Sequence, residues 1–339
     1  MAKISHFIIL LIILVSSCAK DNIDPQKNTT IHGNTPVEIY KNKEHYVAFC
    51  DAIKFGDLYY CTFREGENHA PIYEWDSNGC IKVLVSSDLK HWKEEIIVKD
   101  DEWDLRDPCF CEFSNKLYLY YGYNKYNNPA PDYKNGLIIL TKGSNGLSIE
   151  KKQKVDLGEY SNLWLWKVYF FEGIFSGVAY GEDSSLYYVE SNDGIHFNMV
   201  AKLSAEGNET SLVRLNDNSL LAFIRNSTAK GYSTLAKSKP PYDKWESFTL
   251  NEMIESPESF IIKDDIYVIG RSFYGMSMFK LDLGCKKVEP SFNFFAYGKY
   301  GDCGYPGVIV ENNHIIVIYY AVNPSTEDTC IYQTVLDVD

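Results

Sequence analysis

The stretch from Asn208 to Asn226, NETSLVRLNDNSLLAFIRN, holds an acid and a base that the chain can bring together. Two short apolar runs flank the turn-forming residues 216–219, and this pattern predicts a β-hairpin. Glu209 precedes the first strand and Arg225 closes the second. The carboxylate and the guanidinium should therefore face the same spot, although they are 16 positions apart (225 − 209). A single pair of this kind could be an ordinary surface salt bridge, but the layout recurs.

Six units of strand, turn and strand follow one another, and most of them begin with an acidic residue. The heads of these units are Asp51, Asp107, a position near Trp166, Glu209, Glu255 or Glu258, and Asp302. Arginine closes the second strand of three units, at Arg64, Arg225 and Arg271. The heads recur roughly every 50 residues, which is the length of a four-stranded propeller blade. The sequence therefore predicts an all-β protein, a six-bladed β-propeller.

In a propeller, the residues at the heads of the blades lie close together. The first strand of each blade lines the central channel, and its entrance residue points into a pocket at one end. The acidic heads should then converge on one site: Asp51, Asp107, Glu209, Glu255 or Glu258, and Asp302. A β-sandwich is the competing all-β arrangement, but it does not predict a polar residue at the head of every unit.

Several carboxylates around one pocket suit glycoside hydrolysis. That reaction needs one group to protonate the leaving oxygen and a second to stabilise or attack the sugar carbon. Crowded like charges also raise the pKa of one carboxyl, which can then act as the acid. Aromatic residues make up 15% of the chain. Their rings fill β cores and also pack on the apolar faces of sugars.

The order of Phe63-Arg64, Glu209, Arg225, Arg271 and Tyr305 resembles the sialidase superfamily, over residues 45–337. The resemblance implies a six-bladed propeller in which three arginines clamp the substrate carboxylate and a Tyr–Glu pair supplies the nucleophile. Here the clamp would be Arg64, Arg225 and Arg271. The nucleophile would be Tyr305, with Glu209 as its base. Arginines bind carboxylates through paired hydrogen bonds, and a neutral tyrosine is not repelled by an anionic substrate.

The sequence departs from the family pattern in the motif Phe63–His69, where Glu65-Gly66 stands in place of Ile-Pro. The Asp-box turns typical of the family are degenerate at 86–92 and 191–197. The acid/base aspartate has no clear counterpart, so His69, Glu65 and Asp107 are candidates for that role. The expected catalytic residues are Asp107, Glu209, Tyr305 and His69. The expected substrate-binding residues are Arg64, Arg225, Arg271, Asp51, Glu65, Glu255, Asp302 and Trp166.

These features favour an exo-acting hydrolase that removes a terminal, acidic or deoxy sugar from a glycan or polysaccharide. One alternative is an arabinanase/xylosidase-type propeller glycosidase, in which Asp51, Asp107 and Glu209 would begin successive blades. That fold has five blades and lacks the arginine triad. Another alternative is a non-catalytic surface glycan-binding lipoprotein, which would keep the aromatic and arginine residues but would not need the Glu209–Tyr305 pair.

The N-terminus has the pattern of an export signal. Residues 1–17 combine Lys3 with the apolar run Phe7–Val15 and resemble a lipoprotein signal peptide that ends in a bacterial lipobox at Cys18. The apolar run is shorter than the roughly 20 residues that span a bilayer. We expect a lipid anchor on Cys18, a flexible tether over 18–40 and the propeller over 41–339. The protein is then expected to be a monomer anchored in the bacterial cell envelope.

Charge and cysteine content restrict the partners. The formal net charge of −13 argues against a nucleic-acid surface. Eight cysteines follow Cys18, and Cys50 and Cys61 form the best disulfide candidate across a turn, although free buried thiols are favoured for most. No cysteine or histidine spacing suits a metal site, so we expect neither metal nor cofactor.

Overall fold

The computed structural model describes residues 31–339, apart from 71–78, 126–133, 145, 227–230 and 297–301. The expected signal peptide, the lipidation site Cys18 and the first part of the tether lie outside the described residues. Within the part that is described, no helix is long and apolar enough to cross a membrane.

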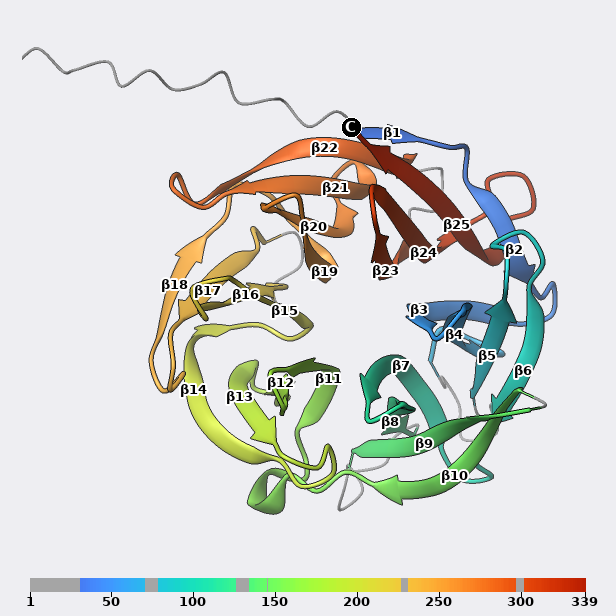
Figure 1. Cartoon of the computed structure of the whole chain (residues 1–339), viewed down its shortest axis with the longest axis horizontal. Helices are drawn as coiled ribbons and strands as arrows, with labels where there is room; N and C mark the ends of the chain where they lie inside the picture. Colours follow the sequence, from blue (N-terminus) through green and yellow to red (C-terminus); the bar gives the residue numbers. More distant parts are fainter. Residues whose placement is uncertain (1–30, 71–78, 126–133, 145, 227–230, 297–301) are drawn as a thin grey trace, which may run out of the picture. The chain divides into compact units, whose positions relative to one another are not determined.

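Six antiparallel sheets radiate from a common axis, one for each predicted unit (Figure 1). Blade 1 contains β3 (Tyr46–Phe55), β4 (Leu58–Gly66), β5 (Cys80–Ser86) and β6 (Lys93–Val98). Blade 2 contains β7 (Asp104–Phe113), β8 (Lys116–Asn124), β9 (Asn135–Gly143) and β10 (Gly146–Lys154). After a 3-10 turn, η1 (Gly158–Tyr160), blade 3 contains β11 (Trp164–Phe171), β12 (Ile174–Tyr180), β13 (Ser185–Ser191) and β14 (Asn198–Glu206).

The second half of the ring repeats this arrangement. Blade 4 contains β15 (Thr210–Arg214), β16 (Leu220–Ile224), β17 (Thr234–Ser238) and β18 (Trp245–Thr249). Blade 5 contains β19 (Glu255–Ile262), β20 (Asp265–Ser272), β21 (Gly275–Asp282) and β22 (Lys287–Ala296). Blade 6 contains β23 (Cys303–Glu311), β24 (His314–Val322) and β25 (Thr329–Val338), together with two N-terminal strands. The predicted six-bladed all-β propeller is confirmed.

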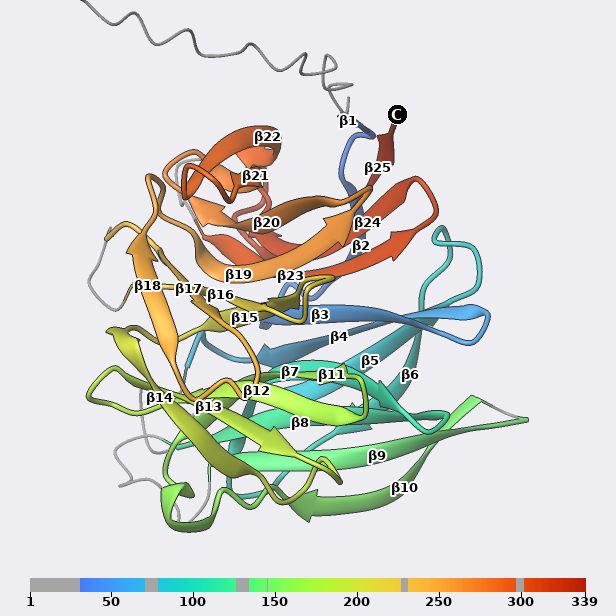
Figure 2. The same cartoon turned by 60° about the vertical axis from the view of Figure 1, so that its left-hand side comes forward.

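The core of the protein lies between neighbouring blades. Strands such as β16 (LLAFI) are apolar along their whole length because both faces of each blade are covered by the next blade. Buried residues form six clusters, and each cluster fills one interface between two blades. The innermost strands β3, β7, β11, β15, β19 and β23 stand around the axis in both views (Figures 1 and 2).

The N-terminal segment closes the ring. β1 (Ile31–Gly33) and β2 (Val37–Lys41) both pair with β25, so the first described residues and the last strand lie side by side (Figure 1). Residues 31–41 therefore belong to blade 6, and the tether expected over 18–40 can reach no further than residue 30. We call β1 and β2 the N-terminal strap.

A buried polar cluster fixes the N-terminal strap to blade 1. Tyr40 on β2 donates a hydrogen bond to Glu65 Oε2 at 2.5 Å, and Lys82 lies 3.1 Å from Glu65 Oε1. Glu65, expected to bind substrate, is 7% exposed and holds the strap instead.

A β-bulge interrupts the innermost strand of five blades near its start. Four residues at equivalent positions in these bulges adopt positive φ: Phe49 (60°), Asp107 (48°), Ser256 (45°) and Tyr305 (51°). Each bulge adds an unpaired residue and turns its side chain out of the ladder. In each of these four blades the bulge therefore turns one side chain out of the ladder near the mouth of the channel.

The two degenerate Asp-box turns fold alike. Asp88 Oδ1 accepts hydrogen bonds from the backbone N–H of Lys90 and His91, both at 2.9 Å. Asp193 Oδ1 accepts equivalent bonds from Ile195 and His196, at 2.8 and 2.9 Å. Both turns join the third and fourth strands of a blade, so alternation of strand direction places them on the face opposite the starts of the innermost strands.

The eight cysteines that the structure describes are free thiols, and Cys285 alone among them is exposed. The candidate disulfide between Cys50 and Cys61 is not formed, whereas the preference for buried thiols is confirmed.

We predict that the N-terminal strap is essential for a stable ring. Deleting residues 1–41 leaves the edge of β25 unpaired and should lower the thermal midpoint by more than about 5 °C. Deleting residues 1–30 serves as the matched control and should leave the midpoint unchanged. Differential scanning calorimetry checks both variants, and equal midpoints would contradict the assignment of residues 31–41 to the propeller.

Candidate functional site

Three residues from blades 4 and 6 meet at the mouth of the channel. The Tyr305 hydroxyl donates a hydrogen bond to Glu209 Oε1, and Arg225 Nη1 lies 2.9 Å from the same oxygen. The hairpin of β15 and β16 brings Glu209 and Arg225 together as its sequence predicted, and a bulge on β23 brings Tyr305 to them. The Glu209 side chain is only 5% exposed, so these bonds form largely out of contact with water.

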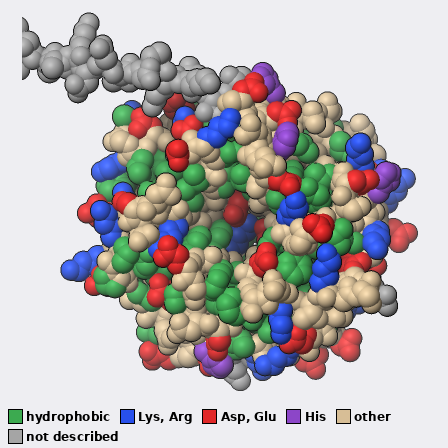
Figure 3. Space-filling model, in the orientation of Figure 1, with side chains coloured by type: hydrophobic (Ala, Val, Ile, Leu, Met, Phe, Trp, Pro, Cys, Tyr) green, Lys and Arg blue, Asp and Glu red, His purple; other side chains and the backbone are tan. Residues whose placement is uncertain are grey.

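A chain of alternating charges continues from this group to the next two blades. Arg225 Nη2 lies 3.3 Å from Glu255, and Arg271 Nε lies 2.7 Å from the other oxygen of Glu255. Arg271 Nη1 then lies 3.3 Å from Asp302, which also accepts a hydrogen bond from Tyr320 at 2.8 Å. These side chains are partly exposed and form a charged wall that solutes can reach. In the space-filling view, acidic and basic side chains are visible in the hollow at the centre of the ring (Figure 3).

The Tyr305 phenol is held in its protonated form. Burial raises its pKa well above the ordinary tyrosine value, and the nearby carboxylates of Asp107 and Glu209 raise it further. In this form the Tyr305 hydroxyl donates its hydrogen to the Glu209 carboxylate, so the proton can pass along this bond.

Ser256 joins the two members of this pair through the backbone. Its N–H donates to Glu209 Oε2 at 2.9 Å, and its hydroxyl accepts a hydrogen bond from the Tyr305 N–H at 3.0 Å. Ser256 is 1% exposed and occupies the positive-φ position of the blade 5 bulge. Sequence reasoning missed Ser256, although the Glu255-Ser256-Pro257-Glu258 segment was correctly placed at the head of a blade.

Asp107 lies near the Tyr305–Glu209 pair and has a raised pKa. Burial raises the pKa of Asp107 to about 7, Arg106 opposes this shift, and Glu209 adds to it. Its Oδ1 is buried without a hydrogen-bond partner among the described residues. A carboxyl with this pKa holds its proton near neutral pH, as a general acid must.

Arg106 is the arginine that accompanies Asp107, and sequence reasoning did not select it. Its guanidinium lies 4.7 Å from the ring centre of Phe49, and the Phe49 ring lies 4.8 Å from that of Tyr305. Its nearest carboxylate, Asp104, is 4.0 Å away, and Arg106 makes no hydrogen bond to any residue that the structure describes. The Arg106-Asp107-Pro108 tripeptide was the available signal in the sequence.

Arg64, the third expected clamp residue, is not part of this group. Its side chain is 1% exposed, Nη2 lies 2.7 Å from Asp104, and Nη1 donates to the Asn68 carbonyl at 2.8 Å. The three arginines around the Tyr305–Glu209 pair are therefore Arg106, Arg225 and Arg271.

Asp51 also lies away from the Tyr305–Glu209 pair, in the interior of the channel. Lys167, 5% exposed, lies 3.4 Å from Asp51 and 2.5 Å from Glu258, and it donates to the Pro306 carbonyl at 3.3 Å. Burial by itself favours the neutral amine, but the Glu258 and Asp51 carboxylates raise the pKa of Lys167. These three charges from blades 1, 3 and 5 form what we call the axial cluster. Of the two candidate heads of blade 5, Glu255 lies at the site and Glu258 lies in the axial cluster.

Two further expected residues, Trp166 and His69, lie beside this group. Trp166 is 2% exposed, and its ring packs edge-on to Tyr305 with centroids 5.8 Å apart, so it supports Tyr305 and is not open to a ligand. His69 is exposed, and its Nδ1 lies 2.9 Å from the Tyr46 hydroxyl, which donates to Asp302. Burial of part of the ring and the nearby Arg106 lower the pKa of His69.

No group of three or more His, Cys, Asp or Glu side chains in the described ranges is placed to hold a metal ion.

Comparison with known proteins identifies the fold. No protein-family model matches the sequence, and a search of curated proteins finds no match. Among solved structures, the chain is similar to a protein of unknown function from Dyadobacter fermentans, with a TM-score of 0.77 and 16% identity over 91% of this chain and 99% of that one. It is also similar to the phage phi92 endosialidase, with a TM-score of 0.67 and 13% identity over 91% of this chain and 69% of that one.

A third similar structure is a mutant of Trypanosoma rangeli sialidase that displays trans-sialidase activity. The TM-score is 0.66 with 12% identity, and the match covers 90% of this chain but only 59% of the sialidase. At these identities the likeness shows the fold alone. The fold is that of the sialidase propellers, as the sequence resemblance predicted.

We predict that Lys167 stabilises the ring in a pH-dependent way. Lys167→Met leaves two buried carboxylates without their cation and should cost about 3–5 kcal/mol of unfolding free energy at pH 8. Burial already raises the pKa of Asp51 and of Glu258, so without Lys167 the folded state will bind more protons than the unfolded chain. The loss should therefore be smaller at pH 5 than at pH 8.

Urea unfolding at both pH values measures this difference. The matched control is Lys280→Met, which breaks a partly exposed pair with Asp265 and should cost less than about 1 kcal/mol at either pH. A Lys167→Met variant that behaves like this control would show that the axial cluster does not hold the blades together.

Proposed function

We propose that the protein is an exo-acting glycoside hydrolase of sialidase type that removes a terminal acidic sugar from a glycan or polysaccharide. The observation that supports this most directly is the buried hydrogen bond from Tyr305 to Glu209, flanked by Arg106, Arg225 and Arg271. A tyrosine whose proton can pass to a carboxylate is a nucleophile that remains neutral until it reacts. The solved sialidase and endosialidase structures share the fold, which is compatible with this chemistry.

The arginines would select the substrate by its charge. Glu209, Glu255 and Asp302 already neutralise much of the charge on Arg225 and Arg271. Arg106 makes no hydrogen bond within the described part of the chain, so we assign to it the largest share of carboxylate binding. Arg106 thus takes the role that the sequence resemblance gave to Arg64. A guanidinium on a low-dielectric floor of aromatic rings binds a carboxylate more strongly than one in water.

The proposed reaction needs two proton transfers in each half. The Tyr305 oxygen attacks the anomeric carbon while its proton moves to Glu209, and Asp107 gives its proton to the departing oxygen. In the second half, Asp107 takes a proton from water as the water oxygen attacks the anomeric carbon. The Tyr305 oxygen then leaves and recovers its proton from Glu209. Asp107 and Glu209 end in the states in which they began.

The arabinanase/xylosidase alternative does not fit the ring. The structure has six blades where that fold has five, and Asp51 lies in the axial cluster and not beside Glu209. One observation favours the alternative of a glycan-binding protein without catalysis. Arg64 pairs with Asp104 and does not join Arg225 and Arg271, so the three arginines expected from the sequence do not form one clamp. Turnover measurements distinguish the proposed hydrolase from a protein that only binds glycans.

We also propose that the chain is a lipoprotein anchored through Cys18 in the bacterial cell envelope and that it acts as a monomer. This proposal rests on the lipobox-like segment Val15–Cys18 and on the short apolar run before it.

We predict that turnover requires both members of the Tyr305–Glu209 pair. Tyr305→Phe and Glu209→Gln should each lower kcat by about 10³-fold or more, because neither variant can pass the phenolic proton to a carboxylate. The measurement is steady-state hydrolysis of aryl glycosides of several acidic sugars. Tyr59→Phe is the matched control, since Tyr59 bonds to Glu311 in a different part of blades 1 and 6. Undiminished turnover in either site variant would refute the proposed roles.

We predict that Asp107 sets the alkaline limb of activity. Because its pKa is raised to about 7, the acid should lose its proton above that pH and kcat/KM should fall. In the unfolded chain an aspartate titrates near 3.9, so between about pH 4 and pH 7 the folded state binds the extra proton. Stability should therefore fall as pH rises through this window.

Asp107→Asn tests both effects at once. The variant should lose turnover. Its unfolding free energy minus that of the parent should be more positive at pH 8 than at pH 4. Thermal melts at the two pH values check the stability and a pH–rate profile checks the activity. Parallel stability curves for parent and variant would show that Asp107 is ionised in the folded protein at neutral pH.

A further inference from the structure

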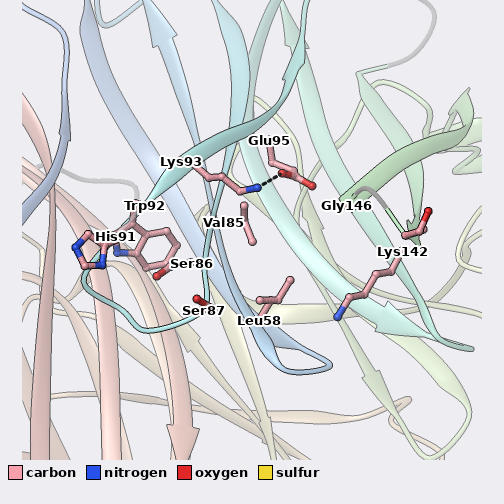
Figure 4. Close-up of a pocket in the computed structure, with 12 residues that line it drawn as sticks. Leu58, Val85, Ser86, Ser87, His91, Trp92, Lys93, Glu95, Lys142 and Gly146 are labelled. Carbon is pink, nitrogen blue, oxygen red and sulfur yellow. Dashed lines mark ion pairs between the residues drawn. The ribbon is translucent and has the colours of Figure 1, made fainter.

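A cavity of about 570 Å³ lies on the face opposite the Tyr305–Glu209 pair. It is lined by Leu58 at the start of β4, by the β5–β6 turn, and by Lys142, Gly143, Ser144 and Gly146 at the adjoining ends of β9 and β10. All of these lie at the end of the blades away from the channel mouth. Blades 1 and 2 thus form its walls, and one of the two Asp-box turns forms part of its rim (Figure 4). The volume is in the range of small-molecule sites in proteins.

The floor of this cavity is apolar. Figure 4 shows Val85 and Leu58 between Trp92 on one side and Lys142 on the other. The indole N–H of Trp92 donates to Gln333 Oε1 on β25 at 3.1 Å, and this bond fixes the plane of the ring. A fixed aromatic ring beside aliphatic side chains can pack against the C–H face of a sugar.

The rim of the cavity is cationic in a protein whose net charge is −13. Lys142 makes no ion pair or hydrogen bond to any residue within the described ranges, and it points into the cavity (Figure 4). Lys93 has only a distant partner, Glu95 at 3.8 Å, and Glu95 itself accepts a hydrogen bond from the Leu147 N–H at 2.7 Å. Because the chain as a whole carries a net negative charge, these two ammonium groups should focus an anionic ligand on the cavity.

The exposed hydroxyls of Ser87 and Ser144 complete the lining. A ligand that satisfies an apolar floor, two lysines and free hydroxyls at once has an apolar face, a negative charge and several hydroxyl groups of its own. An acidic sugar has all three. Inorganic phosphate would leave the floor unused, and a nucleic-acid backbone would require a broader basic surface.

We propose that this cavity binds an acidic sugar unit within an anionic polysaccharide. The site is separate from the channel mouth, so one polysaccharide molecule can be held by one face of the propeller while a chain end is presented to the other. The inference depends on the cavity alone and holds whether or not the channel mouth hydrolyses anything.

Affinity gel electrophoresis with polygalacturonate tests the proposal. The full chain carrying Tyr305→Phe provides the background, which removes turnover as a variable. This protein should be retarded in gels containing polygalacturonate and not in gels containing dextran. Adding Lys142→Glu should weaken binding by about tenfold or more, because it reverses the charge of the lysine that has no ion pair among the described residues. The matched control is Lys239→Glu, which makes the same change of charge on an exposed turn of blade 4 and should leave retardation unchanged.

Several results would overturn the proposal. Equal retardation of the Lys142→Glu and Lys239→Glu variants would show that the cavity is not the site of binding, and so would the absence of retardation for every variant. Sedimentation with vesicles of anionic phospholipid provides a second arm. Vesicle binding that depends on Lys142, without polygalacturonate binding, would assign the cavity to lipid headgroups instead. Circular dichroism of each variant confirms that it is folded, since Lys142 is exposed and its replacement should not disturb the core.

Discussion

The ammonium group of Lys167 is the point on which the innermost strands converge. Removing a charge from water costs several kcal/mol, and only well-placed opposite charges can offset that cost. Asp51 from blade 1 and Glu258 from blade 5 provide them, and the Pro306 carbonyl from blade 6 completes the coordination. Because these partners come from different blades, the ring must close with the correct spacing for the charge to be satisfied. The axial cluster thereby constrains the radius of the channel.

The candidate site is built directly on this constraint. Pro306 follows Tyr305, so the bond from Lys167 fixes the backbone next to the proposed nucleophile. On its other side Tyr305 is held by Ser256, which also fixes Glu209. The phenol and the carboxylate are therefore positioned by main-chain contacts and need no ligand to bring them together. Rigid positioning of this kind reduces the reorganisation that a reaction requires.

Much of the architecture was predictable because it depends on patterns that extend over many residues. Turn residues between apolar runs identified the hairpin of Glu209 and Arg225, and the recurrence of such units gave the number of blades. The direction of single side chains was not predictable, because a bulge shifts the ladder by one residue and its position leaves little trace in one sequence. Asp107 and Tyr305 sit within bulges and reach the mouth, whereas Asp51 and Glu258 follow bulges and point into the channel.

The pairing of the N-terminal strap with β25 governs the order of events during biosynthesis. Ile31 pairs with Val338, which is made 307 residues later (338 − 31). Blade 6 therefore stays incomplete until synthesis is nearly finished, and closing so large a loop is slow because its entropy must be lost before the contacts are gained. A nascent chain with this design therefore cannot close its ring until almost the whole sequence has been made.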